Sequence, residues 1–404
     1  MKTVLVVGAG RYQRPVIRRA KEIGCRVVAV DRNPDAPGLV EADVALVVDF
    51  ADADAVLEAI AGLELDGVTT VQSDLAVPVV ARIAAERGLP GIGVETARLM
   101  TSKVAMRRRL AEAGVPQPRF AFVRGVEDAP SALERVGTPA VLKPGAGSGQ
   151  RGLFRIERLE DVEERLAEAV AISPGEPGLL EEYVDGTELN GIVVLEEGAV
   201  RLVALCDRLR PSGSGFGVSW LHVYPPHLEG ERRAEAERIA VEAARALGLR
   251  TGIAFPQLLA AADGRLLLVE CAARIGGMMA EHLEHALGVD LLEAQLRLAL
   301  GEELPDGLLE PRRQRPTAVR FLTAEPGTLR AGTVTRVGPL EPVLAAPGVV
   351  DASIYAVPGE TIRPVTVISD RRGYVIAVGD SREEAVARAD AGAALVEIEV
   401  EEAR

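Results

Sequence analysis

Residues 140–152 read AVLKPGAGSGQRG, in which a short apolar run ends in Lys143 and is followed by glycines at positions 145, 147, 149 and 152. A second strand-like run, LFRI, begins at residue 153. Glycines let backbone N–H groups turn inward and approach an anion closely, and a nearby ammonium group adds a positive charge. The stretch therefore predicts either a flap over the phosphates of a nucleotide or an ordinary hairpin loop beside a lysine.

The use of lysine favours the phosphate flap. Lysine occurs only at positions 2, 21, 103 and 143, so 42 of the 46 basic residues are arginine. Lys103 and Lys143 therefore look selected for a compact ammonium group, which a guanidinium does not imitate. Lys103 is also predicted in the first turn of a helix capped by Thr101 or Ser102, where a cation gains nothing from the helix dipole. An anionic ligand would explain it. The neighbouring run of arginines at 107–109 is predicted to be a solvated helix face.

Composition limits the class of protein. A chain of 404 residues with 48% hydrophobic and 26% charged residues is typical of a soluble globular protein with two to four domains. The net charge of −14 argues against nucleic acid or an anionic membrane as the main partner. Three cysteines without paired spacing indicate neither a disulfide framework nor a zinc site. No apolar run is long enough to span a bilayer, so a cytoplasmic location is expected.

Residues 1–98 alternate strand-like and helix-like segments, which predicts a parallel, doubly wound sheet. The first turn contains Gly8 and Gly10, and Asp31 follows at the distance expected of a dinucleotide-binding fingerprint. However, Gln13 stands where the third glycine of that fingerprint belongs. The other interpretation is a Rossmann-like scaffold whose sheet edge offers a crevice to a small ligand, lined also by residues 72–74 (QSD).

Acidic residues follow the next apolar strand. Glu181 and Glu182 emerge from the run at 179–180, and Glu188 comes seven residues after Glu181. These side chains could form a solvated edge, or they could accept hydrogen bonds from an amino group and a ribose diol.

A hairpin further on predicts a metal site. Asp263-Gly264 is the strongest short hairpin signal in the chain, and a two-residue turn would place Ala262 opposite Arg265. Counting back then places Gln257 opposite Glu270, with Cβ atoms about 5 Å apart. Two oxygen donors of this kind suit magnesium, completed by water and phosphate. The alternative is a polar pair that faces water, but an uncompensated buried carboxylate would be costly.

A second loop rich in glycine and serine, RPSGSGFGVS at residues 210–219, lies between strand-like segments beside the nucleotide motifs. We infer a substrate-binding role for this region from its placement. The candidate substrate-binding residues are Arg208, Arg210, Ser212, Gly215, the rest of residues 212–217, and His222.

Taken in order, these motifs resemble the ATP-grasp superfamily over about residues 100–300. The run VECAARIGG at 269–277 and the C-terminal region are most similar to carboxylate–amine ligases of the L-amino-acid ligase type. The resemblance implies an α/β fold with a Rossmann-like N-terminal domain, a central ATP-grasp domain of two α+β subdomains, and a small α+β C-terminal domain. The expected boundaries are 1–98, 99–310 (subdomains about 99–180 and 181–310) and 316–404.

The resemblance also implies roles for individual residues, with ATP and Mg²⁺ as cofactors. Gln257 and Glu270 would hold magnesium, and Arg274 would stabilise charge on an acyl phosphate, with Lys143 as a second catalytic residue. The family usually has an asparagine where this chain has Ala272, so either another group supplies that ligand or a second magnesium ion binds more weakly. The implied nucleotide-binding residues are Lys103, Lys143, Gly147, Ser148, Gly149, Glu181, Glu182, Val184 and Glu188.

The implied function is an ATP-dependent ligase that joins a carboxylate to an amine through an acyl phosphate and releases ADP and phosphate, with amino-acid ligase as one form. Such chemistry needs positioning and charge neutralisation rather than a protein nucleophile. The alternatives are a purine-pathway ATP-grasp ligase or carboxylase, a nicotinamide-dependent dehydrogenase, and a nucleotide-binding regulator without catalysis. The expected partners are small-molecule carboxylate and amine substrates, with neither nucleic acid nor membrane, and a second copy of the chain, since family members are often dimers.

Overall fold

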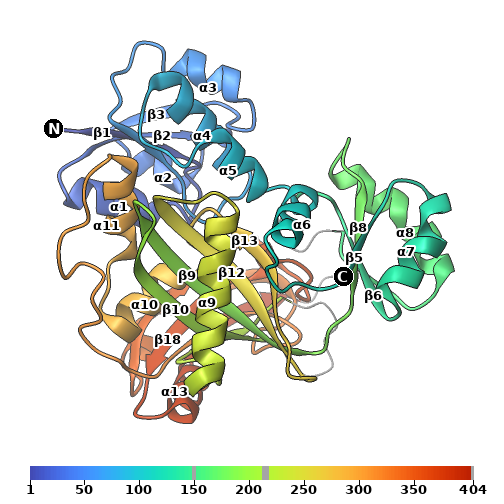
Figure 1. Cartoon of the computed structure of the whole chain (residues 1–404). Helices are drawn as coiled ribbons and strands as arrows, with labels where there is room; N and C mark the ends of the chain where they lie inside the picture. Colours follow the sequence, from blue (N-terminus) through green and yellow to red (C-terminus); the bar gives the residue numbers. More distant parts are fainter. Residues whose placement is uncertain (148–151, 212–217, 402–404) are drawn as a thin grey trace.

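The computed structural model describes residues 1–147, 152–211 and 218–401 (Figure 1). The N-terminal region is a parallel sheet of order β3-β2-β1-β4, as the sequence predicts. Its central strand β1 is buried along its whole length because helices pack on both faces. The elements are β1 (Thr3–Val7), α1 (Arg14–Glu22), β2 (Arg26–Asp31), α2 (Pro37–Glu41), β3 (Val44–Val47), α3 (Ala53–Ala59), β4 (Gly67–Thr69), α4 (Ala76–Arg87) and α5 (Val94–Leu99).

The glycine turn after β1 is closed by the protein's own side chains. Gln13 folds back over Gly8 and Gly10, and its Nε2 donates to the carbonyl of Val71 at 2.7 Å. Asp31, the residue expected on a ribose in a dinucleotide site, accepts from the backbone N–H of Ala9 at 2.9 Å. Gln13 and Asp31 thus form hydrogen bonds within the protein at the positions where a dinucleotide would bind. The turn therefore gives no support to the dehydrogenase alternative.

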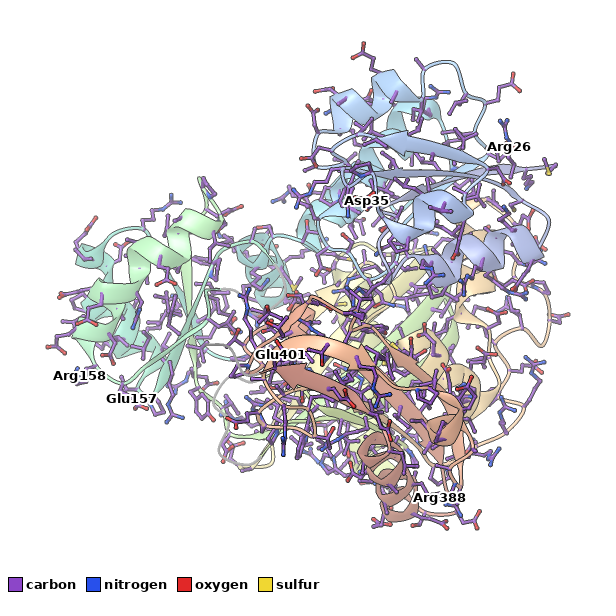
Figure 2. All side chains as sticks on the ribbon, turned by 180° about the vertical axis from the view of Figure 1, so that it is seen from behind. Arg26, Asp35, Glu157, Arg158, Arg388 and Glu401 are labelled. Carbon is purple, nitrogen blue, oxygen red and sulfur yellow. The ribbon has the colours of Figure 1, made fainter. Side chains whose placement is uncertain are left out.

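A small antiparallel sheet of order β5-β8-β6-β7 forms a lobe that projects to one side of the molecule (Figure 1). Helices α7 and α8 cover one of its faces and enclose an apolar core. In the view from behind, Glu157 and Arg158 lie at the far end of this lobe, well away from Arg26 and Asp35 of the N-terminal region (Figure 2). The elements are α6 (Lys103–Glu112), β5 (Phe120–Val123), α7 (Ala129–Val136), β6 (Ala140–Lys143), β7 (Phe154–Ile156), α8 (Leu159–Ile172) and β8 (Gly178–Glu182), with the 3₁₀ turn Val126–Asp128 before α7.

The largest sheet has the order β13-β12-β9-β10-β11-β14-β18-β16 and joins the central and C-terminal parts of the chain. Its last three strands come from the predicted C-terminal domain, so the segment between residues 300 and 316 connects two parts of one sheet. The elements up to this segment are β9 (Gly186–Glu196), β10 (Ala199–Leu209), β11 (Leu221–Tyr224), α9 (Gly230–Ala246), β12 (Gly252–Ala261), β13 (Leu266–Ala272), α10 (Met279–Leu287) and α11 (Leu291–Ala299).

A three-stranded sheet of order β17-β15-β19 lies beside these C-terminal strands and shares an apolar core with them. Among the described residues, no helix is long and apolar enough to cross a membrane. The remaining elements are β14 (Thr317–Phe321), β15 (Gly332–Val337), α12 (Glu341–Leu344), β16 (Val349–Ile354), β17 (Thr361–Ile362), the 3₁₀ turn Ile368–Asp370, β18 (Gly373–Val378), α13 (Arg382–Ala394) and β19 (Ile398–Glu401).

The β12–β13 hairpin corrects one prediction and confirms another. The predicted two-residue turn is wrong: the N–H of Ala261 donates to the carbonyl of Arg265, which leaves a three-residue loop whose last member, Gly264, has φ +91°. The register then shifts by one residue, and Gln257 still pairs with Glu270, as predicted. The three-residue turn by itself would not place these two residues opposite each other. A β-bulge shifts the register by the one residue that is needed.

That bulge also sets the direction of Glu270. Leu266 and Leu268 point into the core beneath α9, and strict alternation would send residue 270 to the same side. The irregularity after Leu268 instead returns Cys271 to that core and leaves Glu270 on the opposite, concave side. The bulge therefore places the carboxylate where a ligand can reach it.

Candidate active site

One cavity of about 290 Å³ lies between the large sheet, the small sheet and the C-terminal ends of the N-terminal strands. Every described residue of the predicted site lines it. Ser148, Gly149, Ser212 and Gly215 belong to the predicted site but lie outside the described residues. The described members are Lys103, Lys143, Gly147, Glu181, Glu182, Val184, Glu188, Arg208, Arg210, His222, Gln257, Glu270 and Arg274.

Lys143 and Glu181 lie side by side on β6 and β8. Lys143 Nζ donates to one oxygen of the buried Glu181 carboxylate, and Arg107 of α6 donates to the other. Burial by itself raises the pKa of Glu181, but the attraction of the two cations outweighs it and lowers the pKa to about 2. Both carboxylate oxygens are engaged within the protein, and the adenine-contacting role of Glu181 stays a prediction.

Arg107 corrects the expectation that residues 107–109 form a solvated face. Its side chain is 2% exposed and also donates to the backbone carbonyls of Leu268 and Val269 on β13. Arg108 and Arg109 are exposed, as predicted. The sequence offered no signal to separate the three, because which side of a short helix is covered depends on the elements packed against it.

Lys103 reaches across the cavity from the N-terminus of α6. Ser102 caps this helix by accepting from the N–H of Ala105, and Lys103 Nζ donates to the carbonyl of Gly147 at 2.5 Å. The same ammonium nitrogen lies 3.6 Å from Glu270 Oε1. Lys103 therefore lies between the glycine-rich loop and the predicted metal ligand, where it could contact a phosphate group.

The predicted metal pair gains a neighbour that sequence reasoning missed. Gln257 pairs with Glu270 on one side and with Asn190 of β9 on the other, and Gln257 Nε2 donates to Asn190 Oδ1 at 3.0 Å. The signal for Asn190 was its position two residues after Glu188 in an otherwise apolar strand, on the same face. Ala272 is buried in the core and supplies no ligand.

The oxygen donors of this row suit a magnesium ion. Glu270 is the one carboxylate in the Asn190–Gln257–Glu270 row, and the described residues contain no group of three or more acidic, histidine or cysteine side chains that could hold a metal. Magnesium commonly binds through one or two carboxylates, with water and substrate phosphates completing the octahedron. The amide and carboxylate oxygens of Gln257 and Glu270 suit that arrangement.

Arg274 connects the cavity to the N-terminal region. Its guanidinium donates to both oxygens of Asp74, at 2.8 and 2.9 Å, and the adjacent carbonyl of Ile275 accepts from the N–H of Gln72 at 3.1 Å. Burial lowers the pKa of Arg274, but the attraction of Asp74 outweighs it and the pKa is raised. Of residues 72–74, Gln72 and Asp74 thus line the cavity, and the contact of Asp74 with Arg274 was not predicted.

The predicted ribose-binding acid is also engaged within the protein. Arg208 lies opposite Glu188 on β10 and forms an ion pair with it, and Arg210 Nε lies 3.2 Å from the other Glu188 oxygen. Arg208 is buried, whereas Glu188 and Arg210 are partly exposed to the cavity. The structure brings these three predicted residues together, and their roles toward a ligand stay predictions.

Arg371 was not singled out by sequence, because it is one of 42 arginines and follows no motif. Its side chain is 6% exposed, stacks 3.5 Å above the Phe321 ring, and donates through Nη2 to the carbonyl and hydroxyl oxygens of Ser219. Among the described residues no carboxylate pairs with it, and residues 212–217 contain no acid. Burial lowers its pKa to about 9. Within the part of the chain that the structure describes, this end of the cavity therefore carries a positive charge that no carboxylate pairs with.

Two family models match the chain. Residues 102–307, just over half of it, match the ATP-binding domain of the carbamoyl-phosphate synthase L chain, and residues 320–401 match C-terminal domain 2 of L-amino acid ligases. The chain belongs to the ATP-grasp carboxylate–amine ligases. This confirms the resemblance seen in the sequence and the fold class that it implies.

Individual relatives of this ATP-grasp ligase are distant. It is 29% identical over 311 residues to the uncharacterized protein y4rH of Sinorhizobium fredii, an alignment that covers 76% of this chain and 62% of the relative. It is 28% identical to the formate-dependent phosphoribosylglycinamide formyltransferase of a Synechococcus species, over 98% of both chains. Among solved structures, the L-amino acid ligase of Bacillus licheniformis superposes with a TM-score of 0.86 at 22% identity, over 99% of both chains.

Proposed function

We propose that this ATP-grasp ligase uses ATP to activate a carboxylate and joins it to the amino group of an amino acid. The observation that carries the proposal is the arrangement in one cavity of the Gln257–Glu270 oxygen pair between two cations, Lys103 and Arg274. Oxygen donors and fixed cations are the groups that phosphoryl transfer requires. The position of the cavity, between Gly147 and the large sheet, supports binding of ATP there.

The reaction would have two steps. A carboxylate oxygen of the first substrate attacks the γ-phosphorus of ATP, the bond to the bridging oxygen breaks, and ADP leaves. The amine nitrogen then attacks the acyl carbon, phosphate leaves, and the amine loses a proton. A magnesium ion held by Gln257 and Glu270 would neutralise phosphate charge.

The chain's own residues would position these groups and neutralise their charge. Lys103 and Lys143 would contact phosphate oxygens, and Arg274 would stabilise charge on the acyl phosphate while Asp74 fixes the guanidinium plane. Preorganised charges of this kind act without reorganisation during the reaction. No protein nucleophile is required.

Arg371 supports an amino acid as the amine substrate. Its Nη1 makes no hydrogen bond to a described residue, and a guanidinium N–H forms a strong, charge-assisted hydrogen bond with a carboxylate. When two amino acids are joined, one carboxylate reacts and the other stays charged, so the second needs a cationic partner. The match of residues 320–401, which contain Arg371, to a domain of L-amino acid ligases supports the same assignment.

ADP release measured across pairs of amino acids tests the function. We expect release that depends on a carboxylate substrate, and hydroxylamine in place of the amine should trap the acyl phosphate as a hydroxamate. ATP turnover that never depends on a carboxylate would contradict the proposal.

A second candidate is ligation to a phosphorylated purine precursor. The alignment with the formyltransferase over 98% of both chains favours it, and Arg371 would suit a phosphate group as well as a carboxylate. ADP release with formate and phosphoribosylglycinamide, but not with any amino acid, would identify this activity.

The expected cytoplasmic location and homodimer stay predictions.

A further inference from the structure

A chain of hydrogen bonds crosses the floor of the cavity and ends at Gln257. Arg371 Nη2 donates to Ser219 Oγ at 2.8 Å, and Ser219 Oγ lies 3.1 Å from His222 Nε2. His222 Nε2 lies 3.3 Å from Asn190 Nδ2, and Asn190 Oδ1 accepts from Gln257 Nε2 at 3.0 Å. The four members from Arg371 to Asn190 are buried. The orientation of each polar group is therefore set by its neighbours rather than by water.

Two groups in this chain of hydrogen bonds can only donate: the guanidinium of Arg371 and the amide nitrogen that Asn190 turns to His222. Ser219 Oγ accepts from Arg371. Burial lowers the pKa of His222 well below its ordinary value, so the ring is neutral, and its Nε2 accepts from the Asn190 amide nitrogen that faces it. Asn190 thus faces His222 with its amide nitrogen and Gln257 with its amide oxygen.

This direction matters at Gln257, whose amide has one oxygen and one nitrogen. With Nε2 turned to Asn190, Oε1 is left without a hydrogen bond to a described residue, on a strand flanked by Glu270. The reverse direction would turn Nε2 away from Asn190, and an amide nitrogen does not bind Mg²⁺. A glutamate at this position would need no such control, because its two oxygens are equivalent.

We propose that Asn190 is a positioning residue that fixes the amide of Gln257, so that Oε1 faces a divalent cation bound with Glu270. This inference rests on the proposed function, which assigns the cation to Gln257 and Glu270. It also explains how a neutral glutamine serves in the Asn190–Gln257–Glu270 row, in which Glu270 is the one carboxylate.

The test is Mn²⁺ binding to the full chain with ADP, followed by electron paramagnetic resonance. Asn190→Leu should weaken Mn²⁺ binding about tenfold, the lower end of what loss of a ligand's supporting hydrogen bond costs. ADP affinity in the absence of metal should stay unchanged. Thermal unfolding checks that the variant is folded, and Asn190→Ala serves if the leucine does not fit.

Gln257→Glu provides the matched background. Because a carboxylate presents oxygen in either orientation, Asn190→Leu should change Mn²⁺ affinity less than twofold when Gln257→Glu is also present. Equal weakening in both backgrounds would indicate a general distortion and overturn the proposal, as would unchanged affinity of the Asn190→Leu single variant. If the unsubstituted chain binds no Mn²⁺ with ADP, the proposed function itself fails, and this inference with it.

Discussion

Buried arginines in the cavity differ in what neutralises them. Arg107 pairs with Glu181, and Arg274 pairs with Asp74. Arg371 has only Ser219 and the face of Phe321 among the described residues. Leaving a buried cation unpaired is costly unless a ligand supplies the opposite charge. Of these three buried arginines, Arg371 is therefore the one whose charge most needs a bound anionic substrate to neutralise it.

Arg371→Gln should raise the KM for the amino-acid amine about 30- to 150-fold, because a hydrogen bond to a charged group is worth about 2 to 3 kcal/mol. With hydroxylamine as the acceptor, the variant should keep the kcat of the unsubstituted chain and its KM for the first substrate. Hydroxylamine has no carboxylate for Arg371 to bind. Steady-state kinetics with both acceptors measures the difference. The exposed Arg363→Gln is the control. Equal losses with the amino acid and with hydroxylamine would exclude the assigned role.

At the level of elements, α6 joins the two sheets that enclose the cavity. Arg107 on α6 donates to Glu181 of β8 and to backbone carbonyls of β13, and Lys103 at the helix start contacts the glycine-rich loop. One short helix therefore fixes the predicted phosphate-binding lysines relative to the predicted metal pair. Its burial pattern reflects these contacts rather than a simple amphipathic face.

Arg107→Met should destabilise the protein by about 3 to 5 kcal/mol, the range for removing one partner of a buried ion pair. Chemical denaturation provides the measurement. Arg109→Met, on the exposed side of the same helix, should change stability by no more than about 0.5 kcal/mol. Similar values for the two variants would show that the Arg107–Glu181 contact contributes little.

The same contact predicts acid sensitivity. The pKa of Glu181 is lowered from 4.5 to about 2 in the folded state, so the unfolded chain binds this proton first as pH falls. The stabilising contribution is complete above pH 4.5 and is lost as pH falls from there to about 2. Denaturation curves across this window should lose less stability in Glu181→Gln than in the unsubstituted chain. A parallel pH dependence of the two would contradict the assignment.

At the level of the whole molecule, the cavity is complete only when the N-terminal region contacts the large sheet. Asp74 holds Arg274, and the N–H of Gln72 donates to the carbonyl of Ile275. Tyr12 of the N-terminal region and Tyr355 of the C-terminal region meet edge to face at 6.0 Å across the Arg371 end. Three segments far apart in sequence thus enclose one site.

Asp74→Asn should lower kcat for hydroxamate formation about tenfold or more, because Arg274 loses one of two bonds that fix its plane and small misplacements of catalytic groups are costly. Binding of ADP with Mg²⁺ should change little, since Arg274 would act on the acyl phosphate. Isothermal titration and kinetics separate the two effects. Asp54→Asn, at an exposed ion pair with Arg82, is the control and should leave both unchanged.

The sequence alone was enough to predict the parallel N-terminal sheet, the family and many of the residues that line the cavity, because alternating apolar runs, glycine loops and the order of motifs are local properties. It also paired Gln257 with Glu270, although from a two-residue turn that the hairpin does not have. Tertiary packing set the bulge in β13, the burial of Arg107, the Asp74–Arg274 contact, and the places of Asn190 and Arg371. Each of these depends on which distant strand or helix packs against the residue, and no local pattern records that choice.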